Sequence, residues 1–209
     1  SEKHKMILEE LLREDGLEAG VLKKKLEVGQ PQFKALLEKG LIRSEKRRVW
    51  RRSYGTEGEN RTEILLNEEQ SDAFKRIKRK ITEDKAAAIL LHGVTGSGKT
   101  SVFEKLIHNT VRLGRRAMLL IPEIGLTPQV LKRFRVLFGE RVAVIHSGLS
   151  LGQRLDEYKR IKRGDADIII GTRSAVFAPA DNIGLIIIDE EGERSYKSDS
   201  SPRYHAHDV

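Results

Sequence analysis

The fold is decided by the stretch Ala86–Thr100, which reads AAAILLHGVTGSGKT. Its first part, Ala86–Leu91, is an apolar run typical of a buried β-strand. Its last part, Gly93–Thr100, matches the pattern G-x-x-x-x-G-K-[ST] just before a helical segment. Glycines in such a loop let backbone N–H groups wrap an anion, and the following helix directs its positive end at that anion. The stretch therefore predicts a strand, a phosphate-binding loop and a helix in succession.

The expected ligand of this loop is ATP with Mg²⁺. Lys99 would neutralise the outer phosphates, and the hydroxyl of Thr100 would bind the magnesium ion. The residues predicted to hold the nucleotide are Gly93, Val94, Thr95, Gly96, Ser97, Gly98, Lys99, Thr100 and Ser101.

A second half of the same site is predicted where the apolar run Leu185–Ile188 ends in Asp189 and Glu190. The cation of such a site lies beside the loop, so its ligand comes from the end of another strand. Asp189 would hold magnesium through its water shell, and Glu190 would orient and deprotonate the attacking water. Acids after a strand also suit a plain solvated loop, but the phosphate-binding loop in the same sheet favours the metal site. Lys99, Asp189 and Glu190 are thus the predicted catalytic residues.

Apolar runs of strand type alternate with amphipathic helical stretches after residue 62. Because these runs are too apolar to face water on either side, they indicate a parallel sheet covered by helices on both faces. We therefore expect an α/β fold, a P-loop NTPase (RecA-like) lobe over residues 62–209. The predicted strands are Ala86–Leu91, Ala117–Ile121, Val142–Ile145, Ile168–Ile170 and Leu185–Ile188.

Residues 1–54 read as a separate winged-helix domain, joined to the lobe by a linker over residues 55–61. Three short helical stretches are followed by two β-prone stretches, 41–43 and 48–52, with a charged hairpin between them. Arg47 and Arg48 of this hairpin are predicted to lie on DNA phosphates. Winged helices also serve as protein-docking modules, so both interpretations stay open.

The composition narrows the class of protein. The 209 residues carry a net charge of +8 and no cysteine, which excludes disulfides and thiolate metal sites. The charge favours a polyanionic partner such as nucleic acid, although solubility alone would also explain it. No apolar run approaches the roughly 20 residues that cross a bilayer, and the first residues are not a secretory leader. We expect a cytoplasmic protein with no membrane association.

The chain resembles the replication-restart branch of the superfamily-two helicases over residues 62–209, and the N-terminal unit fits the module that precedes the motor in that family. The likeness is carried by the phosphate-binding loop together with Ile121–Gln129, His146–Ser150, Gly171–Pro179, Asp189–Glu191, Ser195–Lys197 and Arg203–Ala206.

The resemblance implies an adenine-reading role for Gln70, whose carboxamide has both the donor and the acceptor that the base edge requires. A surface glutamine at a helix start after an asparagine cap would look the same. Three of the family runs follow apolar strands and so share one edge of the sheet, where the family contacts single-stranded DNA. As plain loop caps they would look similar. The residues implied are Thr127, Gln129, Ser147, Thr172, Arg173 and Ser174.

The segment after the acidic pair is, in the family, the loop that senses DNA and informs the ATP site. Here it supplies aromatic and basic side chains that suit stacking on bases and contact with phosphates. The predicted DNA contacts are Tyr196, Lys197, Arg203 and Tyr204. One position departs from the family: Gly192 stands where histidine is usual, which removes an imidazole expected to relay between the nucleotide and the DNA side.

The function implied is that of an ATP-dependent 3′-to-5′ DNA helicase of replication restart. Its expected partners are single-stranded and forked DNA, primosome proteins and single-strand-binding proteins, and we expect a monomer. The alternatives are another superfamily-two DNA translocase, or a non-catalytic nucleotide switch that binds DNA or a partner. Motors of this class close two lobes on the nucleotide, and the second lobe supplies an arginine. We therefore expect residues 1–209 alone to bind nucleotide weakly and to hydrolyse it slowly, if at all.

Overall fold

The computed structural model describes residues 2–13, 17, 19–45, 64–83, 86–199, 201 and 203–209. The chain divides into two compact units, Ser1–Val49 and Trp50–Val209. None of the helices within the described residues is long and apolar enough to cross a membrane.

The N-terminal unit contains three helices, α1 (Glu2–Arg13), α2 (Ala19–Leu26) and α3 (Gln30–Glu38). Pro31 lies in the first turn of α3, where its fixed φ suits the helix and its missing N–H costs nothing. The three helices enclose one small apolar core, made of Ile7, Leu22, Val28, Phe33 and Leu36. The first predicted strand of the hairpin, 41–43, is described and is not a strand. Arg47, Arg48, the second predicted strand over 48–52 and the expected linker over 55–61 lie outside the described residues. The winged helix therefore stays a prediction.

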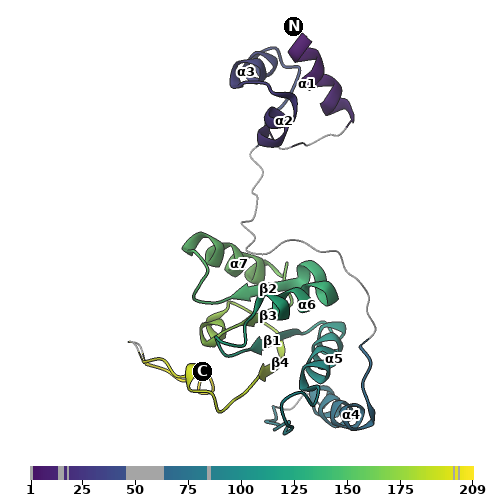
Figure 1. Ribbon diagram of the computed structural model, residues 1–209, viewed down its shortest axis with the longest axis vertical. Helices are drawn as coiled ribbons and strands as arrows, with labels where there is room; N and C mark the ends of the chain where they lie inside the picture. The colour runs from purple at the N-terminus through teal and green to yellow at the C-terminus, as the bar shows by residue number, and fades with distance from the viewer. Residues whose placement is uncertain are drawn as a thin grey trace. The chain divides into compact units, whose positions relative to one another are not determined.

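The second unit is an α/β lobe built on a parallel sheet, as the sequence predicts (Figure 1). The strands are β1 (Arg116–Leu120), β2 (Val142–Ile145), β3 (Ile168–Gly171) and β4 (Ile183–Ile188), in the order β2-β3-β1-β4. The helices are α4 (Glu68–Thr82), α5 (Lys99–Arg112), α6 (Pro128–Phe138) and α7 (Leu151–Arg163). Short 3-10 turns lie at Gly139–Arg141, Arg173–Phe177 and Arg194–Tyr196.

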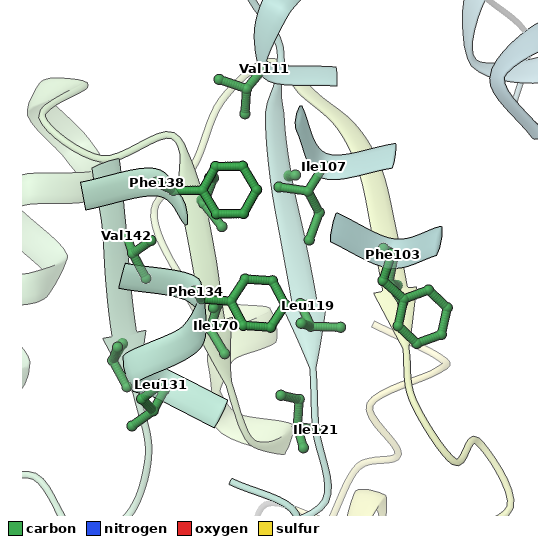
Figure 2. Close-up of a cluster of buried hydrophobic side chains, with 14 residues drawn as sticks. Phe103, Ile107, Val111, Leu119, Ile121, Leu131, Phe134, Phe138, Val142 and Ile170 are labelled. Atoms are coloured by element: carbon green, nitrogen blue, oxygen red, sulfur yellow. The ribbon is translucent and has the colours of Figure 1, made fainter. Parts of the chain in front are cut away.

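Each face of the sheet carries its own apolar core, because successive side chains of a strand point to opposite faces. On β1, Leu119 belongs to the core under α5 and α6, whereas Met118 and Leu120 belong to the core on the other face. Figure 2 shows the first of these cores, with Phe134 of α6 and Ile107 of α5 beside Leu119. This two-sided burial explains why the strands read as nearly continuous apolar runs.

The strand predicted over Ala86–Leu91 is wrong for this structure. Residues 86–94 have no strand assignment, and Ile89 and Leu90 are 47% and 73% exposed. Only Leu91 packs against the lobe, beside α5 and β4. A β-strand needs the hydrogen bonds of a neighbouring strand. Among the described residues β4 pairs with β1 alone, so the run 86–91 is not hydrogen-bonded to the edge of the sheet beside it. The apolar run therefore leads into the phosphate-binding loop from outside the sheet.

Candidate nucleotide site and DNA-facing rim

The segments predicted to carry function are gathered at one edge of the sheet. In the parallel pairing, Leu120 lies opposite both Ile188 and Gly171, and Gly171 lies opposite Ile145. The carboxyl ends of all four strands are therefore in register. The residues that follow them, 121–129, 146–150, 172–174 and 189–190, leave the sheet at this common edge, where open α/β folds bind ligands. We call these segments together the rim.

The loop 93–100 has the backbone that its glycines permit. Gly96 and Gly98 have φ values of 81° and 80°, in the left-handed region, and Gly98 caps the start of α5. A Cβ atom at Gly93 would lie 2.8 Å from the hydroxyl oxygen of Ser97, and one at Gly98 would clash with the Gln70 amide. Gly98 favours glycine because its φ lies in the left-handed region, and at both positions a Cβ atom would displace the end of a neighbouring side chain. The tight curve leads directly into a 14-residue helix, which directs its positive end at the loop.

Lys99 lies against the loop that it belongs to. Its ammonium donates to the carbonyl oxygens of Gly93 at 2.6 Å and Val94 at 3.1 Å. The cation is thus held beside the loop's own backbone, where a bound phosphate would meet both the ammonium and the N–H groups.

Gln70 contacts the loop rather than open solvent. Its side-chain NH₂ donates to the carbonyl of Ser97 at 3.0 Å, and its Oε1 accepts from the Asn67 N–H at 3.1 Å. Asn67 Oδ1 in turn accepts from the Gln70 N–H, which completes a capping box at the start of α4. The structure thus brings Gln70 to the site and gives its amide two partners within the protein.

Asp189 and Glu190 stand at the end of β4. The Asp189 N–H donates to the Leu120 carbonyl at 2.9 Å, the last bond between these strands, and the Glu190 N–H donates to Asp189 Oδ1 at 3.1 Å. Burial raises the pKa of the Asp189 carboxyl, while the Glu190 N–H and the positive charge of Lys99 act in the opposite direction. Glu190 is exposed and has φ 50°, an uncommon conformation for a residue with a side chain.

The chemistry of the residues predicted to hold the metal fits a hydrated divalent cation. A carboxylate at Asp189 and a hydroxyl at Thr100 are oxygen ligands of the kind that Mg²⁺ takes together with phosphate oxygens. Cβ atoms at Gly93 and Gly98 would narrow the loop, so the cradle depends on the residues present.

Two of the predicted DNA contacts are buried, which the sequence did not reveal. Thr172 is 3% exposed and Tyr196 is 0% exposed. The Tyr196 hydroxyl lies 2.6 Å from the Asp189 carbonyl oxygen and 3.1 Å from that of Leu120. The prediction that the Tyr196 ring stacks on bases is therefore wrong in this structure, because the ring is enclosed in the core. Burial also raises the pKa of the phenol, so the hydroxyl stays a hydrogen-bond donor at neutral pH.

The other rim residues predicted to contact DNA differ in their burial and in their hydrogen bonds within the protein. Thr127 caps α6 by accepting from the Val130 N–H, and the exposed Ser147 donates to the Glu123 carboxylate at 3.3 Å. Arg173 donates to the carbonyl oxygens of Ser195 and Lys197. Ser174 is partly buried in the turn after β3. Gln129 lines a hollow of about 560 Å³ between α5 and α6, together with Ser101 and Arg133.

The last described segment, 203–209, folds back beside residues 196–198, which follow the acidic pair Asp189 and Glu190. Lys197 and His205 form an antiparallel bridge, and the rings of Tyr204 and Phe177 meet edge to face at 4.9 Å. Phe177 is 52% exposed and was not predicted, although it lies within the run Gly171–Pro179. Its signal in the sequence was one aromatic residue a few positions after a strand end, at the close of the turn Arg173–Phe177. Lys197 and Arg203 are exposed, as contact with a polyanion requires.

Comparison with known proteins now defines the family. The DEAD/DEAH box helicase family matches residues 67–206. The Replication restart protein PriA of Bacillus subtilis is 45% identical over 192 residues, which are 91% of this chain and 24% of that protein. PriA of Synechocystis is 51% identical over 122 residues, 58% of this chain and 15% of the relative. PriA of Haemophilus influenzae is 44% identical over 151 residues, 72% of this chain and 20% of the relative.

The chain spans about a quarter or less of the length of these relatives. The family match includes the loop 93–100, the rim and the acidic pair, which are the parts that the geometry brings together. On that match the chain belongs to the DEAD/DEAH box helicase family, and the relatives that it resembles there are the replication restart proteins PriA.

Proposed function

We propose that the chain binds ATP with Mg²⁺ at the loop 93–100 and single-stranded DNA along the rim, as the nucleotide-binding lobe of an ATP-dependent DNA helicase. The observation that supports this most directly is the geometry of the loop: Gly96 and Gly98 have left-handed φ values, and Lys99 lies against the Gly93 and Val94 carbonyls at the start of α5. An ammonium on a phosphate-binding loop and a carboxylate on a neighbouring strand end are the two groups between which a metal-bound triphosphate is held.

In this proposal each residue has a separate task. The N–H groups of the loop and Lys99 bind the phosphates, and Thr100 and Asp189 hold the magnesium ion, which neutralises charge on the phosphates. Glu190 accepts a proton from water as the water oxygen attacks the terminal phosphorus and the bond to the bridging oxygen breaks. Its exposed position beside Asp189 leaves the carboxylate accessible to that water.

On the DNA side we assign contacts to the exposed rim residues Gln129 and Ser147 and to the exposed Lys197 and Arg203 of the segment after the acidic pair. Tyr204 and Phe177 would supply aromatic surfaces. Thr172 and Tyr196 are left out because both are buried. We also keep three partly buried residues as proposed DNA contacts: Thr127, Arg173 and Ser174. They would contact DNA through hydrogen-bonding atoms that are not already used within the protein.

The names of the relatives extend the proposal to the whole protein. We propose 3′-to-5′ translocation, action at forked DNA during replication restart, primosome and single-strand-binding proteins as partners, and a monomer in the cytoplasm. The similarity to proteins called Replication restart protein PriA supports the role in replication restart, and the other points are proposed with it.

The test is a titration of the chain with a fluorescent ATP analogue and Mg²⁺, repeated for Lys99→Ala. Loss of one charged hydrogen-bonding group should weaken binding about tenfold or more. Lys162→Ala is the matched control, because Lys162 is an exposed lysine on α7 far along the chain from the loop. Equal affinity of both variants and the parent chain would refute the nucleotide site. Repeating the titration with forked DNA tests the DNA side, where binding of the two ligands should be mutually favourable.

A further inference from the structure

Among the described residues, Tyr196 is the one large aromatic side chain that is both fully buried and hydrogen-bonded to Asp189. Its hydroxyl has a single proton and lies nearer to the Asp189 carbonyl, at 2.6 Å, than to the Leu120 carbonyl, at 3.1 Å. The Leu120 carbonyl already accepts the N–H of Asp189. The hydroxyl therefore donates chiefly to Asp189.

The bond acts on the peptide group that orients the Asp189 carboxylate. The Asp189 carbonyl and the Glu190 N–H belong to one planar peptide group, so fixing the first also fixes the second. That N–H donates to Asp189 Oδ1 at 3.1 Å. The hydroxyl of Tyr196 thus determines, through one rigid unit, the direction from which the carboxylate is held.

The peptide group needs such a hold because the chain next to it is strained. Glu190 has φ 50°, a left-handed conformation that a residue with a Cβ atom rarely adopts. The turn is closed further along by the bond from the Glu193 N–H to the Glu190 carbonyl at 2.9 Å. A conformation of this kind persists only when its surroundings enforce it.

The backbone of Tyr196 is in turn held by the rim. Arg173 donates to the carbonyl oxygens on both sides of it, Ser195 at 3.4 Å and Lys197 at 2.6 Å. The Ala206 N–H donates to the Tyr196 carbonyl at 3.0 Å, which ties in the segment that carries Arg203 and Tyr204. A shift of Arg173 or of residues 203–206 would therefore move the tyrosine, and with it the peptide group at Asp189.

We propose that Tyr196 is a positioning residue for the acidic pair, whose hydroxyl sets the Asp189–Glu190 peptide group and transmits to it the position of the DNA-facing rim. This inference rests on the proposed function, since it assigns a task within the same site. Tyr196 contacts neither nucleotide nor DNA in this proposal. It acts through the backbone of Asp189.

The experiment compares Tyr196→Phe with the parent in the full-length protein encoded by the gene that contains this chain. The variant keeps the ring and removes the hydroxyl. The Mg²⁺ concentration for half-maximal ATP hydrolysis should rise about five- to tenfold, as expected for loss of one hydrogen bond. Binding of ATP without metal should change less than twofold, because the loop is untouched. Tyr158→Phe is the control, since Tyr158 packs against the same core on α7 away from the acidic pair.

The outcomes separate the two proposals. An unchanged Mg²⁺ requirement in Tyr196→Phe, with ATP binding lost in Lys99→Ala, overturns the role of Tyr196 and leaves the proposed function intact. No effect of either variant overturns both. A second measurement does not depend on the variant folding: in the unaltered protein, single-stranded DNA should change the amide exchange rates of Lys197 and Glu190 together. A change at Lys197 with none at Glu190 would contradict the link.

Discussion

His146 lies directly after β2, and its ring Nδ1 accepts a hydrogen bond from the Gly148 N–H at 3.1 Å. An acceptor nitrogen must be unprotonated, and burial, with the charge of Arg154, lowers the pKa of the imidazole although Glu123 acts against this. The folded protein therefore binds fewer protons than the unfolded chain, in which the pKa is about 6.5. The stabilisation is complete above that pH and is lost as the pH falls toward the folded pKa.

We predict that the free energy of unfolding of the parent drops on acidification below pH 6.5 by up to about 1 kcal/mol more than that of His146→Asn, the value of one hydrogen bond. Asparagine offers the Gly148 N–H a similar acceptor but does not titrate. Urea unfolding at several pH values measures the difference. Parallel curves for the two proteins would show that His146 is not the titrating group.

Gly192 is a second residue with a testable consequence. A Cβ atom there would meet nothing within 4 Å, and its φ is outside the left-handed region. Histidine, usual at this position in the helicases that the chain resembles, should therefore be accommodated, with a change in stability below about 0.5 kcal/mol. We expect Gly192→His to raise the stimulation of ATP hydrolysis by DNA in the full-length protein. Gly192→Ala controls for the backbone effect, and equal stimulation in both variants would refute the imidazole's role.

At the scale of elements, α5 and α6 are joined by an ion pair that links the two ligand-facing segments. Glu104 of α5 is 1% exposed and pairs with Arg133 of α6, which also donates to the Ser101 hydroxyl at 3.4 Å. Ser101 follows the phosphate-binding loop, and α6 begins after Thr127 of the rim. A carboxylate so deeply buried depends on its partner, because an unpaired buried charge is strongly unfavourable.

Arg133→Met should therefore destabilise the lobe by about 2–3 kcal/mol, somewhat below the range for fully buried pairs because the arginine is half exposed. The double variant Arg133→Met with Glu104→Gln should regain part of this loss, since no charge is then left unpaired. Arg79→Met is the control: its pair with Glu83 is exposed and should contribute less than about 0.5 kcal/mol. Denaturant unfolding of the four proteins tests the order.

The elements also show what the sequence could predict and where it failed. Four apolar runs became β1 to β4, because strands of a parallel sheet covered by helices are apolar along most of their length. Ala86–Leu91 has the same pattern but lies outside the sheet. Composition predicts that a run suits a strand, but it does not predict whether the run pairs with a neighbouring strand. The prediction for Tyr196 was wrong for a related reason. An aromatic ring among basic residues suits a DNA contact, and only the fold shows that this ring is buried.

The sequence predicted which segments form the candidate site better than it predicted the hydrogen bonds that their side chains make. The loop glycines, Lys99 and the acidic pair can be recognised from local sequence, and the parallel register of the strands brings the acidic pair and the rest of the rim to one edge. The contact of the Gln70 NH₂ group with Ser97 spans 27 residues, and the contacts of Arg173 with Ser195 and Lys197 span more than 20. No local pattern specifies such contacts.

At the scale of the whole molecule, two compact units with separate cores are carried by one chain of net charge +8. The charge alone does not say which unit meets DNA, because both solubility and phosphate contact use basic residues. The dependence of affinity on salt separates the two, since only cations that neutralise phosphates release counterions.

We predict that replacing Arg47 and Arg48 together by alanine lowers the slope of log K against log salt concentration for forked DNA by about 1.5, because each phosphate contact contributes about 0.7 on single strands and 0.9 on duplex. Replacing the exposed Lys3 and Lys24 of the same unit removes equal charge and should leave the slope nearly unchanged. An equal reduction in both double variants would mean that the unit attracts DNA only through its overall charge. A slope unaltered by either pair would instead favour protein docking, since the hairpin arginines would then contact no phosphate.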